Sequence, residues 1–245
     1  MPCCLVGSEM CIRDSIVSTI SRSMTVKLSK KSKTPSFYLP NWVDPNKINP
    51  ETSKPHLYTE SDKIVLLYSG NIGDKQDWKI FIEFCEDIDQ NRYEVIIVGE
   101  GAKKEWLVEK TARFSNVKHY PPVPYRDLSD LLCSADIHLL FQKPEFLDSV
   151  MPSKVLGMMA STKPSFIIGH KDSEINIIFN SIDIGVCFDA YSKEVAEQLY
   201  KLTNDTSRME EMGKNARSYV LEHFSKEKVL NLSLIHISEP TRQQG

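Results

Sequence analysis

The chain has 245 residues, of which 41% are hydrophobic and 26% are charged, and its formal net charge is −3. This composition is typical of a soluble globular protein with one large or two small domains. The slight acidity argues against a nucleic-acid-binding protein, and no apolar run approaches the roughly 20 residues that span a bilayer.

The six cysteines include no CxxC pair, so the sequence indicates neither a zinc site nor a disulfide framework. Cys85, Cys133 and Cys187 lie in apolar patterns, as reduced core residues do. We therefore expect a cytoplasmic protein that holds no metal.

Both ends of the chain look foreign to the rest of it. Residues 7–15 (GSEMCIRDS) and 232–242 (LSLIHISEPTR) resemble translated sequencing-adapter read-through. We therefore expect residues 1–15 and 232–245 to be non-native ends, which carry no information about the fold. The natural start of the protein is then expected to be missing.

Residues 16–33 are basic, with Ile16, Ile20, Met24 and Leu28 at a spacing of four. This pattern predicts a basic amphipathic helix that touches anionic lipid or packs on a partner domain; a solvated helix end is the plainer alternative. A short strand is predicted at 36–39. Residues 45–62 are polar and contain prolines, which is typical of a linker between domains.

From residue 63 onward, apolar strand patterns alternate with helical patterns. This alternation predicts an α/β fold with a Rossmann-like, doubly wound parallel sheet. In such sheets ligands bind beyond the carboxyl ends of the strands, where the loops 69–75, 99–102, 121–125 and 142–154 are expected to lie. Strands are predicted at 64–68, 93–98, 117–120, 135–141, 165–168 and 185–188, and helices at 75–88, 102–113, 125–134, 153–160, 172–181 and 192–231, the last with breaks near 204 and 224.

The first of these loops suggests an anion site. Gly70 and Gly73 enclose a tight turn around Asn71, and Asp74 then has the character of a helix N-cap. Lys75 would fall in the first helical turn, where a cation costs roughly 0.3–1 kcal/mol. The free N–H groups of that turn bind anions, so a phosphate beside Lys75 would explain the lysine. The plainer alternative is a solvated lysine.

The loop at 145–154 repeats the pattern. Ser153 is a predicted N-cap, and Lys154 again stands at a helix start. Two such lysines at one sheet edge, which Gly99 of the loop 99–102 also borders, predict a shared phosphate or diphosphate. Asp148 flanks this turn and is the best-placed carboxylate for sugar hydroxyls, unless it is an ordinary loop acid.

Other phosphate and hydrolase motifs are missing from the chain. The sequence contains no GxxxxGK[ST], no GxGxxG and no GxSxG. His138 lies within an apolar strand pattern, which favours a core histidine over a catalyst.

Four segments, taken together and in order, resemble the donor-binding domain of GT-B glycosyltransferases of family 4. The nearest group builds bacterial capsule, colanic-acid-type exopolysaccharide and O-antigen. LPNWVD (39–44) is similar to the crossover from the acceptor domain of these enzymes. The four segments are SGNIGDKQDW (69–78), VIIVGEG (95–101), PYRDLSDLLCSADIHLLF (124–141) and SVMPSKVLGMMASTKPSFI (149–167).

The resemblance implies two Rossmann-like domains that hold a nucleotide sugar in their cleft. It implies a retaining transfer to a glycan or lipid-linked acceptor, without an obligatory metal or other cofactor, in the cytoplasm or at the inner face of the membrane. It places Gly73 and Lys75 on the donor diphosphate, with the lysine stabilising the leaving group. Backbone near Val123 would meet the base.

The resemblance also assigns a role to the second lysine-bearing turn. Residues 148–154, including Ser149, Val150, Met151 and Ser153, would hold the sugar and the distal phosphate against a helix N-terminus. Many members carry two glutamates eight positions apart on this loop and helix, where this chain has Ser149 and Gly157. Ribose contact and nucleotide identity therefore stay open, and Lys154 could take over part of the phosphate binding.

On this interpretation residues 16–44 are the remnant of an acceptor domain and its crossover, 45–62 a linker, and 63–231 the donor-binding domain. The chain alone is then expected to bind donor and to transfer little. A sugar-nucleotide epimerase of the same architecture is an alternative, although no clear set of carboxylates and histidine supports it. A flavodoxin-like binding module would need an acidic pocket where Ser69, Gly70 and Asn71 stand. A third alternative is an unstable fragment with an exposed sheet edge.

Overall fold

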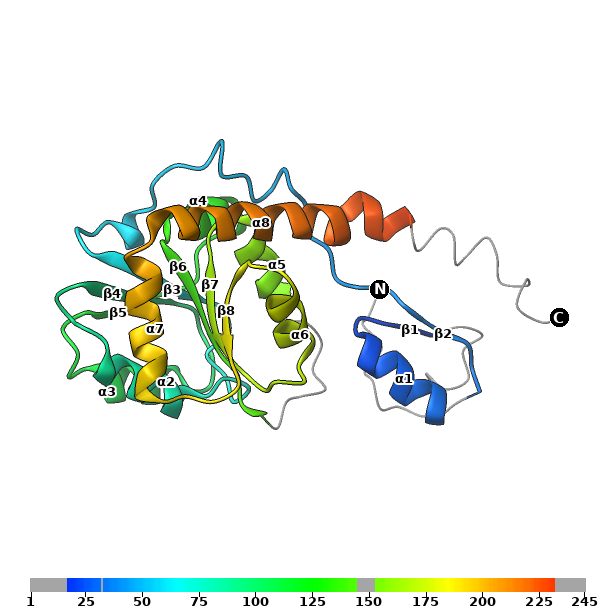
Figure 1. The fold of residues 1–245 in the computed structure, drawn as a ribbon, viewed down its shortest axis with the longest axis horizontal. Coiled ribbons are helices and arrows are strands. Elements are labelled where there is room, and N and C mark those ends of the chain that lie inside the picture. Colours follow the sequence, from blue (N-terminus) through cyan, green and yellow to red (C-terminus); the bar gives the residue numbers. More distant parts are fainter. Residues whose placement is uncertain (1–16, 32, 145–152, 232–245) are drawn as a thin grey trace.

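The computed structural model describes residues 17–31, 33–144 and 153–231. A six-stranded, fully parallel sheet forms its centre, in the order β5–β4–β3–β6–β7–β8 (Figure 1). The chain starts at β3 in the middle, winds outward to β5, returns to β6 and winds outward to β8, which is the doubly wound order. The predicted α/β class is thus confirmed. The strands are β3 (Ile64–Ser69), β4 (Tyr93–Val98), β5 (Val117–Tyr120), β6 (Ile137–Phe141), β7 (Ser165–Ile168) and β8 (Gly185–Phe188).

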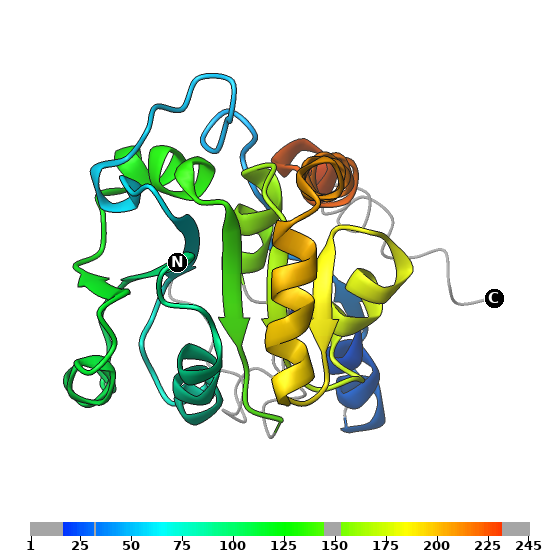
Figure 2. The ribbon, with the colours of Figure 1, turned by 60° about the vertical axis from the view of Figure 1, so that its left-hand side comes forward.

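Helices cover both faces of the sheet, because alternate strand residues point to opposite sides. Leu67 belongs to a buried cluster that includes residues of α4, α5, α6 and α8, whereas Leu66 belongs to a cluster with α2, α3 and α7. In Figure 2 the strand arrowheads point away from α8, so this long helix crosses the amino end of the sheet. The helices are α2 (Trp78–Asp87), α3 (Lys104–Thr111), α4 (Leu128–Ser134), α5 (Ser153–Ala160), α6 (Glu174–Ser181), α7 (Lys193–Thr203) and α8 (Thr206–Phe224).

A small β–α–β unit precedes the sheet and lies to one side of it (Figure 1). Its strands β1 (Val17–Thr19) and β2 (Ser36–Tyr38) pair in parallel, and α1 (Arg22–Lys31) connects them. The single amphipathic helix predicted over 16–33 is therefore wrong. The β-branched residues Val17 and Thr19 favour a strand, so Ile20 lies outside the helix. The four-residue spacing between Ile20 and Met24 therefore does not place them on one helix face.

Residues 45–62, predicted as a linker, form hydrogen bonds with α4 and stack an aromatic ring on β5. Just before them, Val43 is buried, its N–H donates to Phe224 O at 2.9 Å, and its carbonyl accepts from Lys226 N at 3.0 Å. The segment that enters the body and the end of α8 are thus joined by backbone. Further contacts are Asn49 N to Ser129 Oγ (3.0 Å), Lys54 N to Asp130 Oδ1 (2.9 Å), His56 N to Ser134 Oγ (3.0 Å) and the stacked rings of Tyr58 and Tyr120 (4.1 Å).

Thr162, just after α5, is strained. Its φ is +64°, a left-handed conformation that disfavours β-branched side chains, and its buried Oγ1 has no hydrogen-bond partner within the described residues. We expect Thr162→Gly to raise the free energy of unfolding by about 1 kcal/mol, because strain of roughly 1–2 kcal/mol outweighs the added freedom of the unfolded chain.

Urea unfolding monitored by circular dichroism measures this change. Thr162→Ala is the matched control, since it removes the hydroxyl but keeps the strained Cβ, and it should gain less. Equal stability of the glycine and alanine variants would contradict the strain argument.

Candidate functional site

The candidate site lies where the strand order reverses, at the carboxyl ends of β3 and β6. The loop after β3 meets the loop after β4 here, and the start of α5 approaches both. The sequence predicts a phosphate at this edge, and the geometry shows how the three segments fit together.

Glycines allow the two loops to touch. A Cβ on Gly99 would stand 1.9 Å from the carbonyl oxygen of Gly70, and one on Gly101 would stand 2.3 Å from that of Ile72. Gly70 itself has a φ of +145°, which side chains rarely adopt. Backbone hydrogen bonds lock the loops: Gly70 N to Val98 O (2.9 Å), Ile72 N to Glu100 O (2.8 Å) and Lys103 N to Ile72 O (2.9 Å).

Lys154 in the first turn of α5 reaches the locked loop. Its ammonium donates a hydrogen bond to Tyr68 Oη at 3.0 Å and lies 4.4 Å from the centroid of that ring. The Tyr68 hydroxyl in turn donates to the carbonyl of Asn71 at 2.7 Å. The Lys154 stem packs beside Gly70, where a Cβ would be 3.4 Å from Cδ. Three contacts therefore fix the ammonium against the glycine turn.

The charge of Lys154 is poorly solvated. The residue as a whole is half-buried, but its charged end lies between Tyr68 and Gly70, and this burial lowers its pKa to about 7. Burial likewise raises the pKa of Tyr68 well above its usual range, so the phenol stays neutral. No carboxylate of residues 17–31, 33–144 or 153–231 forms an ion pair with Lys154. An anion that enters here would supply a counter-charge that no described residue provides.

A cavity of about 380 Å³ opens beside Lys154. Ser69, Gly70 and Ser153 line it at the lysine end, and Asp44 lines it from the segment that precedes the sheet. Trp42 and Tyr125 stand at its mouth, 47% and 68% exposed. Its wall is apolar and includes Leu128, Leu132, Leu156, Gly157 and Met158.

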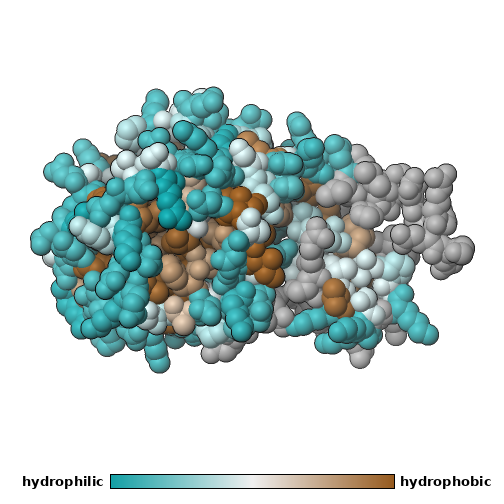
Figure 3. Space-filling view, in the orientation of Figure 1, coloured by the Kyte–Doolittle hydropathy of each residue, from teal (hydrophilic) through white to brown (hydrophobic). Residues whose placement is uncertain are grey.

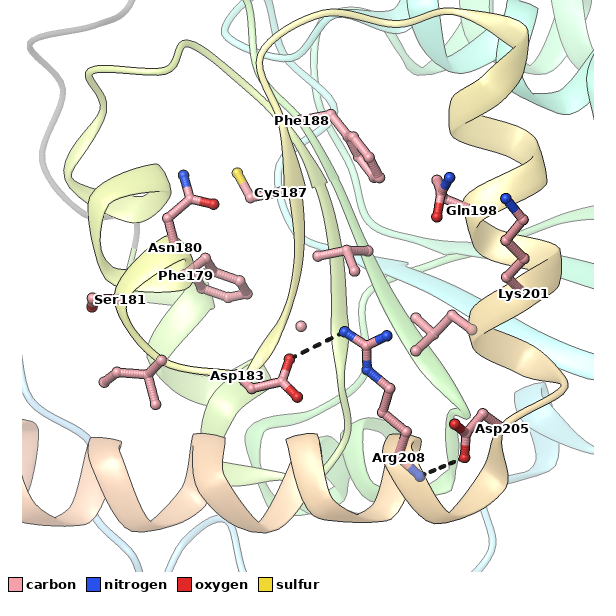
Figure 4. Close-up of a pocket in the computed structure, with 14 residues that line it drawn as sticks. Phe179, Asn180, Ser181, Asp183, Cys187, Phe188, Gln198, Lys201, Asp205 and Arg208 are labelled. Carbon is pink, nitrogen blue, oxygen red and sulfur yellow. Dashed lines mark hydrogen bonds and ion pairs between the residues drawn. The ribbon is translucent and has the colours of Figure 1, made fainter.

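A second cavity, of about 440 Å³, lies elsewhere, along the outermost strand β8 between α6 and α7 (Figure 4). Arg208 and Asp183 form an ion pair of 3.5 Å at one end of it. Figure 3 shows apolar side chains over α6 and β8 on this face, between polar rims. Strand β7 lies between β8 and the β3–β6 reversal, so we do not assign the anion to this cavity.

The first loop corrects one prediction. Helix α2 begins at Trp78, and its N-cap is Asp77, which accepts a hydrogen bond from Ile80 N at 3.2 Å. Asp74 is therefore not the cap, and Lys75 is an exposed turn residue outside the first helical turn. The reason is a long-range contact, since Gln76 pairs with Gln142 as an antiparallel bridge and delays the helix. Lys75 is therefore not a cation in the first helical turn, and only the family resemblance supports its contact with the donor diphosphate.

The other predicted residues differ in where they lie. Ser153 and Lys154 border the cavity with Gly70, whereas Val123 is half-buried and packs against the core beside it. Asn71 contributes its carbonyl to Tyr68, and its side chain lies against Gly73. Asp148, Ser149, Val150 and Met151 lie outside the described residues.

Sequence reasoning missed Tyr68, Asp44, Trp42 and Tyr125. The signal for Tyr68 was a tyrosine near the end of an otherwise aliphatic strand, which by itself also fits ordinary strand propensity. His138 is a core residue, as predicted: its Nε2 pairs with Ser161 Oγ at 2.8 Å, and burial lowers its pKa to about 3.

Two further findings concern the described part of the chain. No group of three or more histidine, cysteine, aspartate or glutamate side chains comes together there as metal ligands would. Among its helices, none is both long and apolar enough to cross a lipid bilayer.

The sequence matches known proteins over most of its length. A family model described as glycosyl transferases group 1 matches residues 50–219, more than half of the chain. The chain is 30% identical over 226 residues to an Escherichia coli K12 protein named as a colanic acid biosynthesis glycosyl transferase, WcaI. That match covers 87% of this chain and 54% of WcaI, so the chain spans about half the length of this relative.

Solved structures share the fold. HepE (Alr3699) of Anabaena, in complex with UDP-glucose, gives a TM-score of 0.73 at 14% identity, over 91% of this chain and 64% of HepE. A glycosyltransferase of Rickettsia africae gives 0.75 at 14% identity, over 94% and 64%. The predicted resemblance to GT-B glycosyltransferases of the bacterial polysaccharide type is confirmed. The family match favours this class over the epimerase and the flavodoxin-like module, and the chain belongs to the glycosyl transferases group 1 family.

Proposed function

We propose that this chain binds the nucleotide-diphosphate sugar donor of a retaining glycosyltransferase. One observation carries the proposal: the Lys154 ammonium is buried beside Gly70 at the strand-order reversal, with Tyr68 as its described partner. A diphosphate there would receive a charge-assisted hydrogen bond from Lys154. Free backbone N–H groups at the start of α5 would add to it.

The relatives support the choice of ligand. HepE was solved with UDP-glucose bound, and WcaI is named for colanic acid biosynthesis. We propose that the whole protein transfers the donor sugar to a glycan or lipid-linked acceptor in cell-surface polysaccharide synthesis. The transfer would take place at the cytoplasmic face of the membrane and would need no metal.

In this proposal the two lysines share the work of stabilising the leaving group. As the bond between the sugar and the diphosphate breaks, negative charge grows on the distal phosphate, and a cation fixed beforehand stabilises that charge. Lys154 is fixed by its contacts to Tyr68 and Gly70. Lys75 is exposed and would complete the site when the donor is bound, and Asp148 would contact sugar hydroxyls.

Calorimetric titration of the full chain with UDP and with GDP, in the presence of EDTA, tests the proposal. We expect saturable binding of one nucleotide, at least tenfold weaker in Lys75→Ala, which corresponds to about 1.4 kcal/mol. Lys201→Ala is the matched control, because Lys201 is an exposed lysine that lines the cavity along β8.

Failure of a folded chain to bind either nucleotide would overturn donor binding. A larger loss in Lys201→Ala than in Lys75→Ala would move the site to the β8 cavity. Measurable transfer by this chain to a lipid-linked acceptor would contradict the expectation that it is inactive alone.

A further inference from the structure

Asp44 places a carboxylate in the wall of the cavity that contains Lys154. The backbone around it is firmly held, because Val43 bonds to the end of α8 and the Asp44 carbonyl accepts from Lys47 N at 3.0 Å. One carboxylate oxygen, Oδ1, accepts from Asn46 N at 3.0 Å in a local turn. Within the described residues, Oδ2 has no hydrogen-bond donor. The turn therefore fixes the carboxylate and leaves one oxygen available.

The charged side chains of the cavity suit one kind of ligand. Lys154 supplies positive charge beside Gly70, Lys47 is a second, exposed lysine in the lining, and Asp44 is the only carboxylate among the described residues that line the cavity. The wall is apolar at Gly157, which has no side chain to offer a polar group, and Trp42 and Tyr125 border the mouth. A suitable ligand has an anionic part and a separate part that donates hydrogen bonds.

An ionised carboxylate only accepts hydrogen bonds, and bonds to a charged acceptor are the strong ones. Two neighbouring hydroxyls of a sugar ring can both donate to it. A diphosphate would be repelled by the same carboxylate. Asp44 thus favours a molecule in which a vicinal diol lies some distance from the phosphates, as in a ribonucleoside diphosphate.

We propose that Asp44 accepts hydrogen bonds from a vicinal diol of the donor and thereby selects ribonucleotide donors over deoxy analogues. This inference rests on the proposed donor binding. The ribose of the nucleotide and the ring of the transferred sugar both carry such a diol, and the experiment separates these two sources.

The experiment measures the affinity of the full chain for four kinds of probe by calorimetry. These are inorganic pyrophosphate, UDP or GDP (whichever binds more tightly), the 2′,3′-dideoxy form of that nucleotide, and UDP-glucose. Asp44→Asn is the key variant, because its amide oxygen can still accept from Asn46 N and preserve the turn while the charge is removed. Asp44→Ala removes the charge and also breaks the turn, so the difference in affinity between the two variants gives the effect of losing the turn.

In the wild-type chain, the dideoxy nucleotide should bind at least tenfold more weakly than the ribonucleotide. Asp44→Asn should reduce this ratio to less than threefold, while pyrophosphate binds unchanged or more tightly because repulsion is removed. If Asp44→Asn instead abolishes the higher affinity of UDP-glucose relative to UDP and keeps the preference for the ribonucleotide over its dideoxy form, the diol belongs to the transferred sugar.

Two results would overturn the inference. The first is that Asp44→Asn leaves unchanged both the preference for the ribonucleotide over its dideoxy form and the gain in affinity from glucose, while Asp44→Ala lowers all affinities equally. Asp44 would then only shape the turn. The other is the absence of binding by every nucleotide, which would refute the donor-binding proposal together with this one.

Discussion

Replacing Lys154 by methionine is expected to weaken nucleoside diphosphate binding by about 10–100-fold. Methionine keeps an unbranched apolar stem beside Gly70 and Tyr68 but removes the charge, and hydrogen bonds to charged groups contribute about 1.5–3 kcal/mol. Calorimetric titration with UDP or GDP measures the loss. Lys163→Met, at the amino end of the sheet, is the control and should leave the affinity unchanged.

The protonation of Lys154 gives this prediction a second signature. Since burial lowers its pKa to about 7, much of the lysine is neutral at pH 8 in the free chain, and a bound diphosphate should recharge it. Binding at pH 8 should therefore take up close to one proton, measured from binding enthalpies in two buffers of different ionisation enthalpy. At pH 6 the lysine is already charged and the Lys154 share of the uptake should vanish. Equal uptake by Lys154→Met at pH 8 would contradict the assignment.

The same pKa shift affects stability without a ligand. The unfolded chain holds the Lys154 proton up to about pH 10, whereas the folded chain releases it near 7, so the unfolded state binds more protons between these values. The stability cost of Lys154 is full below pH 7 and disappears as pH rises toward 10. The measured quantity is the unfolding free energy of the wild type minus that of Lys154→Met. This difference should rise from pH 7 to pH 10, by at most about 1.4 kcal/mol per pH unit.

Replacing Gly99 by alanine is expected to lower the free energy of unfolding by more than about 3 kcal/mol. The new Cβ would lie 1.9 Å from the Gly70 carbonyl oxygen, so the two loops must separate and break their backbone hydrogen bonds. Urea unfolding measures the loss, and the variant should also lose nucleotide affinity because the turn beside Lys154 moves.

Gly73→Ala is the matched control from the same loop. Its Cβ would meet only the end of the Asn71 side chain, at 2.7 Å, and that side chain can rotate away. We expect a loss below about 1 kcal/mol, because rotation of the Asn71 side chain relieves the contact without moving the backbone. If the two variants prove equally stable, the close approach of the loops does not hold the site together.

The sequence was most informative about the limits of the strands. β4 at Tyr93–Val98 is buried at every position, and its limits, like those of β5, β7 and β8, agree with the prediction. Element limits that depend on distant contacts could not be found this way. Asp74 and Asp77 are both of a residue type that caps helices, but only Asp77 caps α2, and the bridge between Gln76 and Gln142 decides between them.

The site was only partly visible for the same reason. Lys154 stood out because a cation at a helix start needs an explanation, whereas Tyr68 looked like an ordinary strand residue until its contact with Lys154 was seen. Asp44 is the last residue of the segment 39–44, which was interpreted as the crossover from the acceptor domain. Its place in the cavity depends on the packing of residues 43–48 against the body, which no local pattern reveals.

The backbone bonds between Val43 and the end of α8 have a mechanical consequence. The chain enters and leaves the six-stranded body at one point, so a pull applied to its two flanks loads the Val43–Phe224 and Lys226–Val43 bonds first. The sheet and its interlocked loops lie outside this load path. Motion of anything attached to either flank would reach the cavity through the turn that contains Asp44, and the glycine turn beside Lys154 would stay still.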